Sequence, residues 1–145
     1  MRKILILMTC VLLTACVDDS ASYYIDGADH SLSLRRRQPY IWDEQVALAL
    51  SVSRWPDCVR LHRLTLLPAS QVRLELFATG EQAWSLRHGA QIWQVESKTC
   101  NGLTVLDHMP EGGLGQRLGI FTVQDKKLVF RAEPASAAPA PGNPG

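Results

Sequence analysis

Residues 46–53 read Val-Ala-Leu-Ala-Leu-Ser-Val-Ser, with a large apolar side chain at every second position. Successive side chains of a β-strand point to opposite faces, so this alternation predicts a strand with one buried face. Asp43 and the two alanines of the stretch 43–53 would also suit the start of a helix, which leaves an α+β fold as the alternative. The regular spacing of the large residues favours the strand.

The same alternation recurs on both sides of this segment. Leu32 and Leu34 alternate with polar residues, and so do the apolar residues of 72–76. Other short apolar runs that are typical of strands occupy residues 59–66, 83–86, 92–97, 103–106, 118–123 and 128–131. Residues that favour turns separate these runs. We therefore expect a small all-β domain over residues 31–133, an antiparallel sandwich or barrel.

Composition limits the class of protein further. The 145 residues include 15 basic and 14 acidic side chains, so the chain is nearly neutral. A nucleic-acid-binding domain would carry clustered Lys and Arg, and we expect no nucleic-acid partner. Residues 134–145 contain only Pro, Ala, Ser, Gly and Asn. Such a segment buries too little apolar surface to fold, so we predict a disordered tail.

The N-terminal segment has the features of an export signal. Arg2 and Lys3 precede an apolar run, Ile4 to Leu13, which is shorter than the roughly 20 residues of a membrane-spanning helix. The run ends in Leu13-Thr14-Ala15-Cys16. This order of features resembles the signal of bacterial lipoproteins. The resemblance implies that residues 1–15 are removed and that Cys16 carries a covalent lipid.

The resemblance also implies a location in the bacterial cell envelope. Residues 16–30 would be the lipidated cysteine and a polar tether to the domain. A single acyl chain binds membranes only marginally, whereas two or more hold a protein stably. Val17, rather than an aspartate, follows the cysteine, which by the same resemblance implies an outer-membrane protein that faces the periplasm.

The cysteines fit this compartment. Cys10 would leave with the signal and Cys16 would carry lipid, which leaves Cys58 and Cys100. An even pair in an oxidising space predicts a disulfide, here between two strand ends. Two free thiols or a metal pair are the alternatives, but no Cys-x-x-Cys or second cluster of ligands supports them.

Recognised catalytic motifs do not occur in the sequence. The four histidines are His30, His62, His88 and His108, and none has the spacing of a metal site. Neither a Gly-x-Ser-x-Gly nor a Ser-x-x-Lys motif occurs. We predict no catalytic residue, no metal and no cofactor beyond the covalent lipid. A hydrolase whose site forms only on folding remains an alternative.

The four tryptophans fall into two pairs. Trp84 and Trp93 have apolar neighbours and are predicted to lie in the core. Trp42 and Trp55 flank turns. We expect them to pack in the core or at its rim, and the alternative is a partly exposed aromatic that meets a ligand or partner.

Two segments are candidates for contact with a partner protein. The densest run of charge is Arg35, Arg36 and Arg37, and in a strand the first and third share one face. A flexible loop is predicted around Gly112, Gly113 and Gly115. We expect a non-catalytic accessory or binding subunit of an envelope assembly. The alternative is a periplasmic inhibitor of a hydrolase such as lysozyme, with a loop in the enzyme's cleft.

Overall fold

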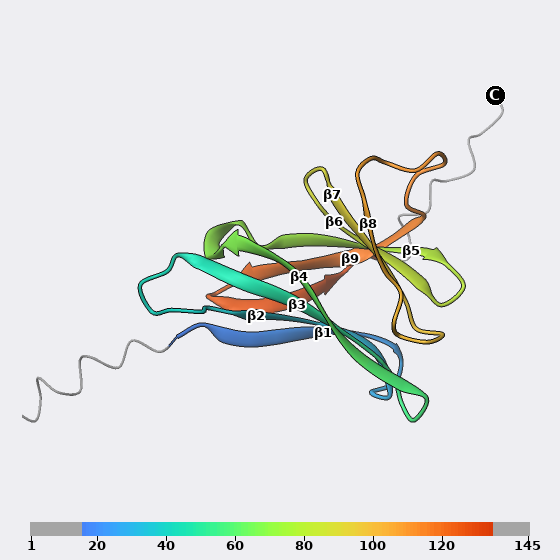
Figure 1. Cartoon of the computed structure of the whole chain (residues 1–145), viewed down its shortest axis with the longest axis horizontal. Helices are drawn as coiled ribbons and strands as arrows, with labels where there is room; N and C mark the ends of the chain where they lie inside the picture. The colour runs from blue at the N-terminus through green and yellow to red at the C-terminus, as the bar shows by residue number, and fades with distance from the viewer. Residues whose placement is uncertain (1–15, 135–145) are drawn as a thin grey trace, which may run out of the picture.

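Within residues 16–134, the period-two pattern of the sequence is realised in ten strands and two antiparallel sheets (Figure 1). The computed structural model describes residues 16–134. The sheets pack face to face, which confirms the predicted all-β sandwich. The predicted signal peptide and residues 135–145 of the predicted tail lie outside the described residues.

The first sheet follows the order of the chain, and its strands are β1 (Asp18–Asp26), β2 (His30–Arg37), β3 (Gln45–Arg54) and β4 (Cys58–Pro68). Strand β3 contains the segment for which a helix was the alternative, so the prediction of a strand is confirmed.

The second sheet has six strands in the order β10-β9-β5-β6-β7-β8. They are β5 (Arg73–Gly80), β6 (Ala83–His88), β7 (Gln91–Glu96), β8 (Leu103–Leu106), β9 (Gln116–Gln124) and β10 (Lys127–Ala132). A short 3-10 helix, η2 (Ala69–Gln71), leads from β4 into β5 and so from one sheet to the other.

Strand β1 corrects the prediction of a tether over residues 16–30. It pairs along its length with β2, and Ala21, Tyr23 and Ile25 pack against the core. This edge strand contributes one modest apolar face, and the aspartates and serines of its other face hid the pattern. As a consequence, Cys16 lies only two positions before the sheet.

The core lies between the sheets and takes alternate residues from both. The first sheet contributes chiefly Leu32, Leu34, Val46, Leu48, Leu50 and Val52. The second contributes chiefly Leu74, Leu76, Trp84, Leu86, Trp93, Val95 and Phe121. The prediction of core positions for Trp84 and Trp93 is confirmed. The expectation of core or rim packing for Trp42 and Trp55 is wrong, because both are largely exposed.

The two long sides of the sandwich are closed differently. On one side β1 lies beside β10. There the buried Arg36 guanidinium donates two hydrogen bonds to the Asp19 carboxylate, and it donates a third, of 2.7 Å, to the Lys126 carbonyl oxygen. On the other side a disulfide joins β4 to the connection between β7 and β8.

Helices are a minor part of this architecture. Within residues 16–134, no helix has the length and apolar character that crossing a membrane requires.

Candidate functional site

The outer face of the second sheet is covered by its own chain. Leu114, from the loop between β8 and β9, is buried against Phe77 and Ile92, and Leu106 packs beside them. The Arg87 guanidinium lies over the Phe77 ring, 5.4 Å from its centroid. Apolar side chains on this face are therefore shielded from water.

The glycines of this loop allow it to lie close to the sheet. Thr79 Oγ1 donates a hydrogen bond of 3.0 Å to the Leu114 carbonyl oxygen. Gly115 has a φ of +96°, and a Cβ atom there would lie 2.1 Å from the Ala78 carbonyl oxygen. Only glycine fits such a position. The predicted partner-binding residues Gly112 and Gly113 are exposed at the same turn.

The outer face of the first sheet has no such cover among residues 16–134. We call this surface the β4 face. It consists of the outward side chains of β2, β3 and β4, namely Ser33, Arg35, Arg37, Ala47, Ala49, Ser51, Ser53, Val59, Leu61, Arg63 and Leu66. Val59, Leu61 and Leu66 are each more than half exposed.

Strand pairing brings charge and apolar surface together on the β4 face. Ala49 of β3 lies between Arg35 and Arg63 in the register. Ala47 likewise lies between Arg37 and Leu66. The outward side chains of β3 are alanines and serines, which project less from the sheet than the arginines of β2 and the leucines of β4. A second chain could therefore approach the sheet closely along β3.

Strand β4 is also a free edge. It has 11 residues and, within the described part of the chain, pairs with β3 alone. An edge strand presents unpaired N–H and C=O groups that another strand can pair with. The register shifts by one residue near Leu64, and Arg60 and Arg63 lie along the strand. Charge and irregularity of this kind oppose pairing of an edge with a copy of itself.

The three consecutive arginines of β2 divide as the alternation predicts. Arg36 points inward and is buried, so its guanidinium is committed to Asp19 and Lys126. Arg35 points outward and pairs with Asp18, through hydrogen bonds of 2.9 and 2.8 Å. Arg37 is exposed. Two of the three predicted contact residues therefore lie on the β4 face.

The two predicted contact segments do not meet. Figure 1 shows the end of β2 at one end of the molecule, whereas the loop that joins β8 to β9 projects at the other. One partner surface therefore does not combine the arginine run with the glycine loop.

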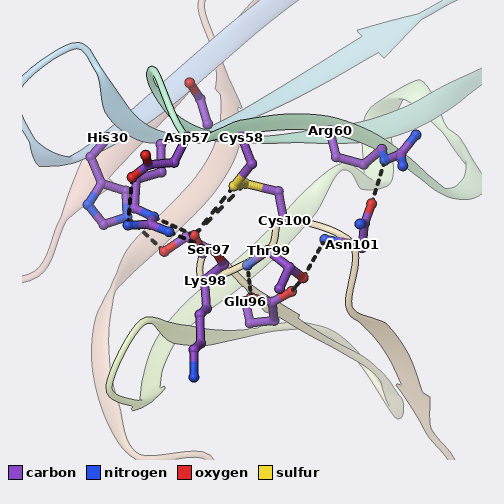
Figure 2. Close-up of a disulfide and its surroundings, with 12 residues drawn as sticks. His30, Asp57, Cys58, Arg60, Glu96, Ser97, Lys98, Thr99, Cys100 and Asn101 are labelled. Carbon is purple, nitrogen blue, oxygen red and sulfur yellow. Dashed lines mark hydrogen bonds and ion pairs between the residues drawn. A yellow bond between two sulfur atoms is a disulfide. The ribbon is translucent and has the colours of Figure 1, made fainter.

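The predicted disulfide between Cys58 and Cys100 is present, with 5.9 Å between the Cα atoms (Figure 2). Cys58 begins β4, as expected. Cys100 lies in the β7–β8 connection rather than at a strand end, because β7 already ends at Glu96. The bond thus joins the two sheets.

Polar contacts hold the β7–β8 connection beneath β4. His62 Nε2 donates to the Cys100 carbonyl oxygen over 2.7 Å, and Arg60 Nε donates to Asn101 Oδ1 over 2.8 Å. The Arg54 guanidinium donates to the carbonyl oxygens of Ser97 and Lys98, each over 2.7 Å. These side chains come from β3 and β4, so they bind one sheet to the other.

Glu96 organises the same connection. Its carboxylate accepts hydrogen bonds from the Thr99 N–H and hydroxyl and from the Gly102 N–H. Desolvation opposes ionisation, but these bonds and one from a further backbone N–H outweigh it and lower the pKa of Glu96 to about 2. A charged Glu96 is therefore part of the native turn that carries Cys100.

One pair of side chains has the contact of a catalytic dyad. His30 Nε2 lies 2.8 Å from Ser97 Oγ, the distance that a base and a nucleophile require. Burial, and then the nearby Arg54, lowers the pKa of His30. However, Ser97 is fully buried, so a substrate has no access to its hydroxyl. We assign the pair to the interface between the sheets.

Side chains of the types that can bind a metal ion are spread over the described part of the molecule. Across positions 16–134, no group of three or more His, Cys, Asp or Glu side chains is placed to hold a metal ion.

Sequence reasoning missed the apolar part of the β4 face. The signal was available, because Val59 and Leu61 alternate with polar neighbours while the buried residues of β4 lie on the other face. Its meaning depends on the order of the strands, which makes β4 an edge.

Comparisons of the chain with protein families, with curated proteins and with solved structures found no match. The fold and surfaces of the molecule are therefore the basis for its proposed function.

Proposed function

We propose that this protein is a lipid-anchored, non-catalytic binding subunit of a bacterial envelope assembly, and that the β4 face recognises its protein partner. One observation carries the proposal: an 11-residue edge strand bears Val59, Leu61 and Leu66 toward solvent. Soluble proteins seldom leave a long apolar edge open, because such an edge invites pairing. A partner that pairs with β4 would satisfy both its backbone groups and its apolar side chains.

The β4 face also defines the chemistry of that partner. An extended segment added to the free edge of β4 would place alternate side chains beside Val59, Leu61 and Leu66 on the outer face of the sheet. Arg63 of β4 favours an acidic side chain beside it, and the exposed Arg37 extends the basic surface across β3, whereas Arg35 is already paired with Asp18. We therefore propose an extended protein segment with alternating apolar residues and at least one acidic residue.

Anchoring would place this face where the partner is. The cysteine proposed to carry lipid, Cys16, is exposed and outside any disulfide. A lipid there would confine the domain to the membrane surface, which raises the effective concentration of the domain at envelope partners. By the resemblance of residues 1–16, the compartment proposed is the periplasmic side of the outer membrane.

Site-specific photocrosslinking in intact cells tests the binding face. A photoreactive residue would replace Leu61, and the matched control would replace Val105 on β8. These residues are 55% and 54% exposed, and each lies on an edge strand of its own sheet. We expect a defined protein adduct from position 61 and none from position 105. Equal adducts from both positions, or none from position 61, would contradict the proposal.

A second experiment separates binding from chance proximity. The paired change Leu61→Asp and Leu66→Asp should abolish co-purification of the crosslinked partner, because it introduces charge where apolar contact and acidic recognition are proposed. Val105→Asp should leave co-purification intact. Inhibition of added lysozyme by the wild-type protein, retained in the Leu61/Leu66 variant, would instead favour the hydrolase inhibitor.

A further inference from the structure

The loop between β2 and β3 exposes three large side chains in succession. Tyr40, Ile41 and Trp42 are all more than half exposed, and Trp42 is 78% exposed. We call these three residues the aromatic loop. Contiguous exposed apolar residues mark sites of contact with another surface.

The aromatic loop is ordered before any contact is made. The Asp43 N–H donates a hydrogen bond of 3.1 Å to the Tyr40 carbonyl oxygen. The Gln38 side-chain amide donates to the Asp43 carbonyl oxygen. The Tyr40 and Trp42 rings stack, with 5.2 Å between centroids and 11° between planes. The aromatic side chains are thus held outward by the turn.

The aromatic loop lies beside the start of the described chain (Figure 1). The Gln38 N–H donates a hydrogen bond of 2.8 Å to the Val17 carbonyl oxygen, and the Val17 N–H donates one of 3.3 Å to Gln38 Oε1. A groove of about 610 Å³ runs between the loop and the β4–β5 connection, and its lining includes Val17, Ile41 and Trp42. The neighbour of Cys16 is therefore in the same local surface as the aromatic loop.

The short stretch of chain between Cys16 and the sheet would keep a lipid anchor close to the aromatic loop. Strand β1 begins at Asp18, two positions after Cys16. Two extended residues span at most about 7 Å. A lipid on Cys16 would bring the headgroup region to this end of the sandwich, and so would the apolar run Ile4 to Leu13 if it stayed attached.

We propose that the aromatic loop inserts into the membrane interface beside the lipid anchor. This inference rests on the anchoring at Cys16 that the proposed function includes. Tryptophan and tyrosine favour the headgroup level, because each combines a large apolar ring with a hydrogen-bonding group. Arg37 precedes the loop, and Asp43 and Glu44 follow it, so the contact relies on the rings rather than on net charge.

The contact would orient the domain. A lipid chain alone leaves a protein free to rotate at the membrane. A second attachment at the aromatic loop would hold the end of the sandwich that carries this loop against the membrane. Strand β4 then runs from the distant end of the sandwich toward the membrane, because η2 at its end lies near the aromatic loop (Figure 1). The β4 face would stand upright from the membrane, open to a partner beside it.

Tryptophan fluorescence provides the test, with Trp55 as the matched control. Trp55 is 65% exposed and lies in the β3–β4 turn, at the other end of β3. The full lipoprotein, purified from membranes, would be reconstituted into phosphatidylethanolamine–phosphatidylglycerol vesicles that contain brominated lipid. Trp55→Phe leaves Trp42 as the exposed reporter, and Trp42→Phe leaves Trp55. Trp84 and Trp93 are buried and give the same background in both.

We expect a blue shift and loss of emission in brominated vesicles for the Trp55→Phe protein, and neither change for Trp42→Phe. Mass spectrometry of the N-terminal peptide reports on the anchor independently. If the peptide carries lipid but Trp42 is quenched no more than Trp55, the membrane contact is overturned and the anchor stands. A peptide without lipid, on a protein that does not sediment with vesicles, would overturn both.

Discussion

The two sheets of this sandwich differ in whether the apolar residues on their outer faces are shielded from water. Each has an inner face that builds the core and an outer face that carries some apolar residues. On the second sheet Leu114 and its loop fold back over Phe77 and Ile92. On the first sheet Val59, Leu61 and Leu66 stay in water.

The difference separates stability from recognition. A covered face contributes to the free energy of folding, since its apolar area is already removed from water. The apolar area of a bare face is still in water, so its burial can contribute to the free energy of binding a partner. The first sheet also carries the aromatic loop, so both surfaces that we propose for contact belong to it.

Removal of the disulfide should have the largest effect, because it removes the covalent link between the two sheets. The double change Cys58→Ser and Cys100→Ser opens a cross-link over 42 residues, which should lower the free energy of unfolding by about 4 kcal/mol in the chain-entropy account. Urea unfolding measures the change, and reduced wild-type protein should match the variant. An unchanged midpoint would show that the other contacts between the sheets suffice.

The cover of the second sheet can be removed next. Leu114→Ala should cost about 3 kcal/mol, as a buried leucine truncated to alanine commonly does. Met109→Ala changes an exposed residue of the same loop and should stay within about 0.5 kcal/mol. Thermal or urea unfolding compares them, and equal losses would mean that the loop adds no cover.

Strands β1 and β2 are joined by one inward ion pair, Asp19–Arg36, and one outward ion pair, Asp18–Arg35, whose contributions to stability can be compared. Asp19→Asn should lower stability by about 2 kcal/mol, because it leaves the buried Arg36 without its carboxylate. This is below the usual cost for a fully buried pair, since Asp19 is partly exposed. Asp18→Asn, which breaks the exposed pair with Arg35, should have little effect. The opposite order in urea unfolding would contradict this assignment.

Acid should destabilise the turn in the β7–β8 connection that Glu96 organises and that carries Cys100. The pKa of Glu96 is about 2 in the folded protein, below its ordinary value near 4.5. A lowered pKa adds stability above the unfolded value, and that part is lost as the pH falls from about 4.5 toward 2. The difference in midpoint between wild type and Glu96→Gln should therefore shrink over this range. A constant difference would argue against a charged Glu96 in the turn.

The smallest effect on stability is expected on the bare face. Leu61→Ser should change the free energy of unfolding by no more than about 0.5 kcal/mol, because the side chain is already exposed. The same variant should no longer bind the partner that we propose for the β4 face. A large destabilisation, measured in the same urea titration, would place Leu61 among the stabilising residues instead.

Local regularities of the chain were readable in advance. The strand segments followed from alternation at period two, which depends on neighbours in sequence alone. The disulfide followed from compartment and count. Strand β1 was missed because polar residues fill its exposed face, and the exposure of Trp42 and Trp55 was missed because neighbours in space decide it.

The sequence by itself determined the all-β class, the inward and outward positions within most strands, and the pairing of Cys58 with Cys100. It did so because side-chain direction in a strand repeats every second residue, and because only Cys58 and Cys100 are left as a pair once Cys10 and Cys16 are assigned to the predicted lipoprotein signal. Tertiary structure alone decided that β4 is a free edge, that Leu114 covers one sheet while the other stays bare, and that the aromatic loop lies beside Val17. Each of these depends on which segments distant in sequence come together, and no local pattern specifies that.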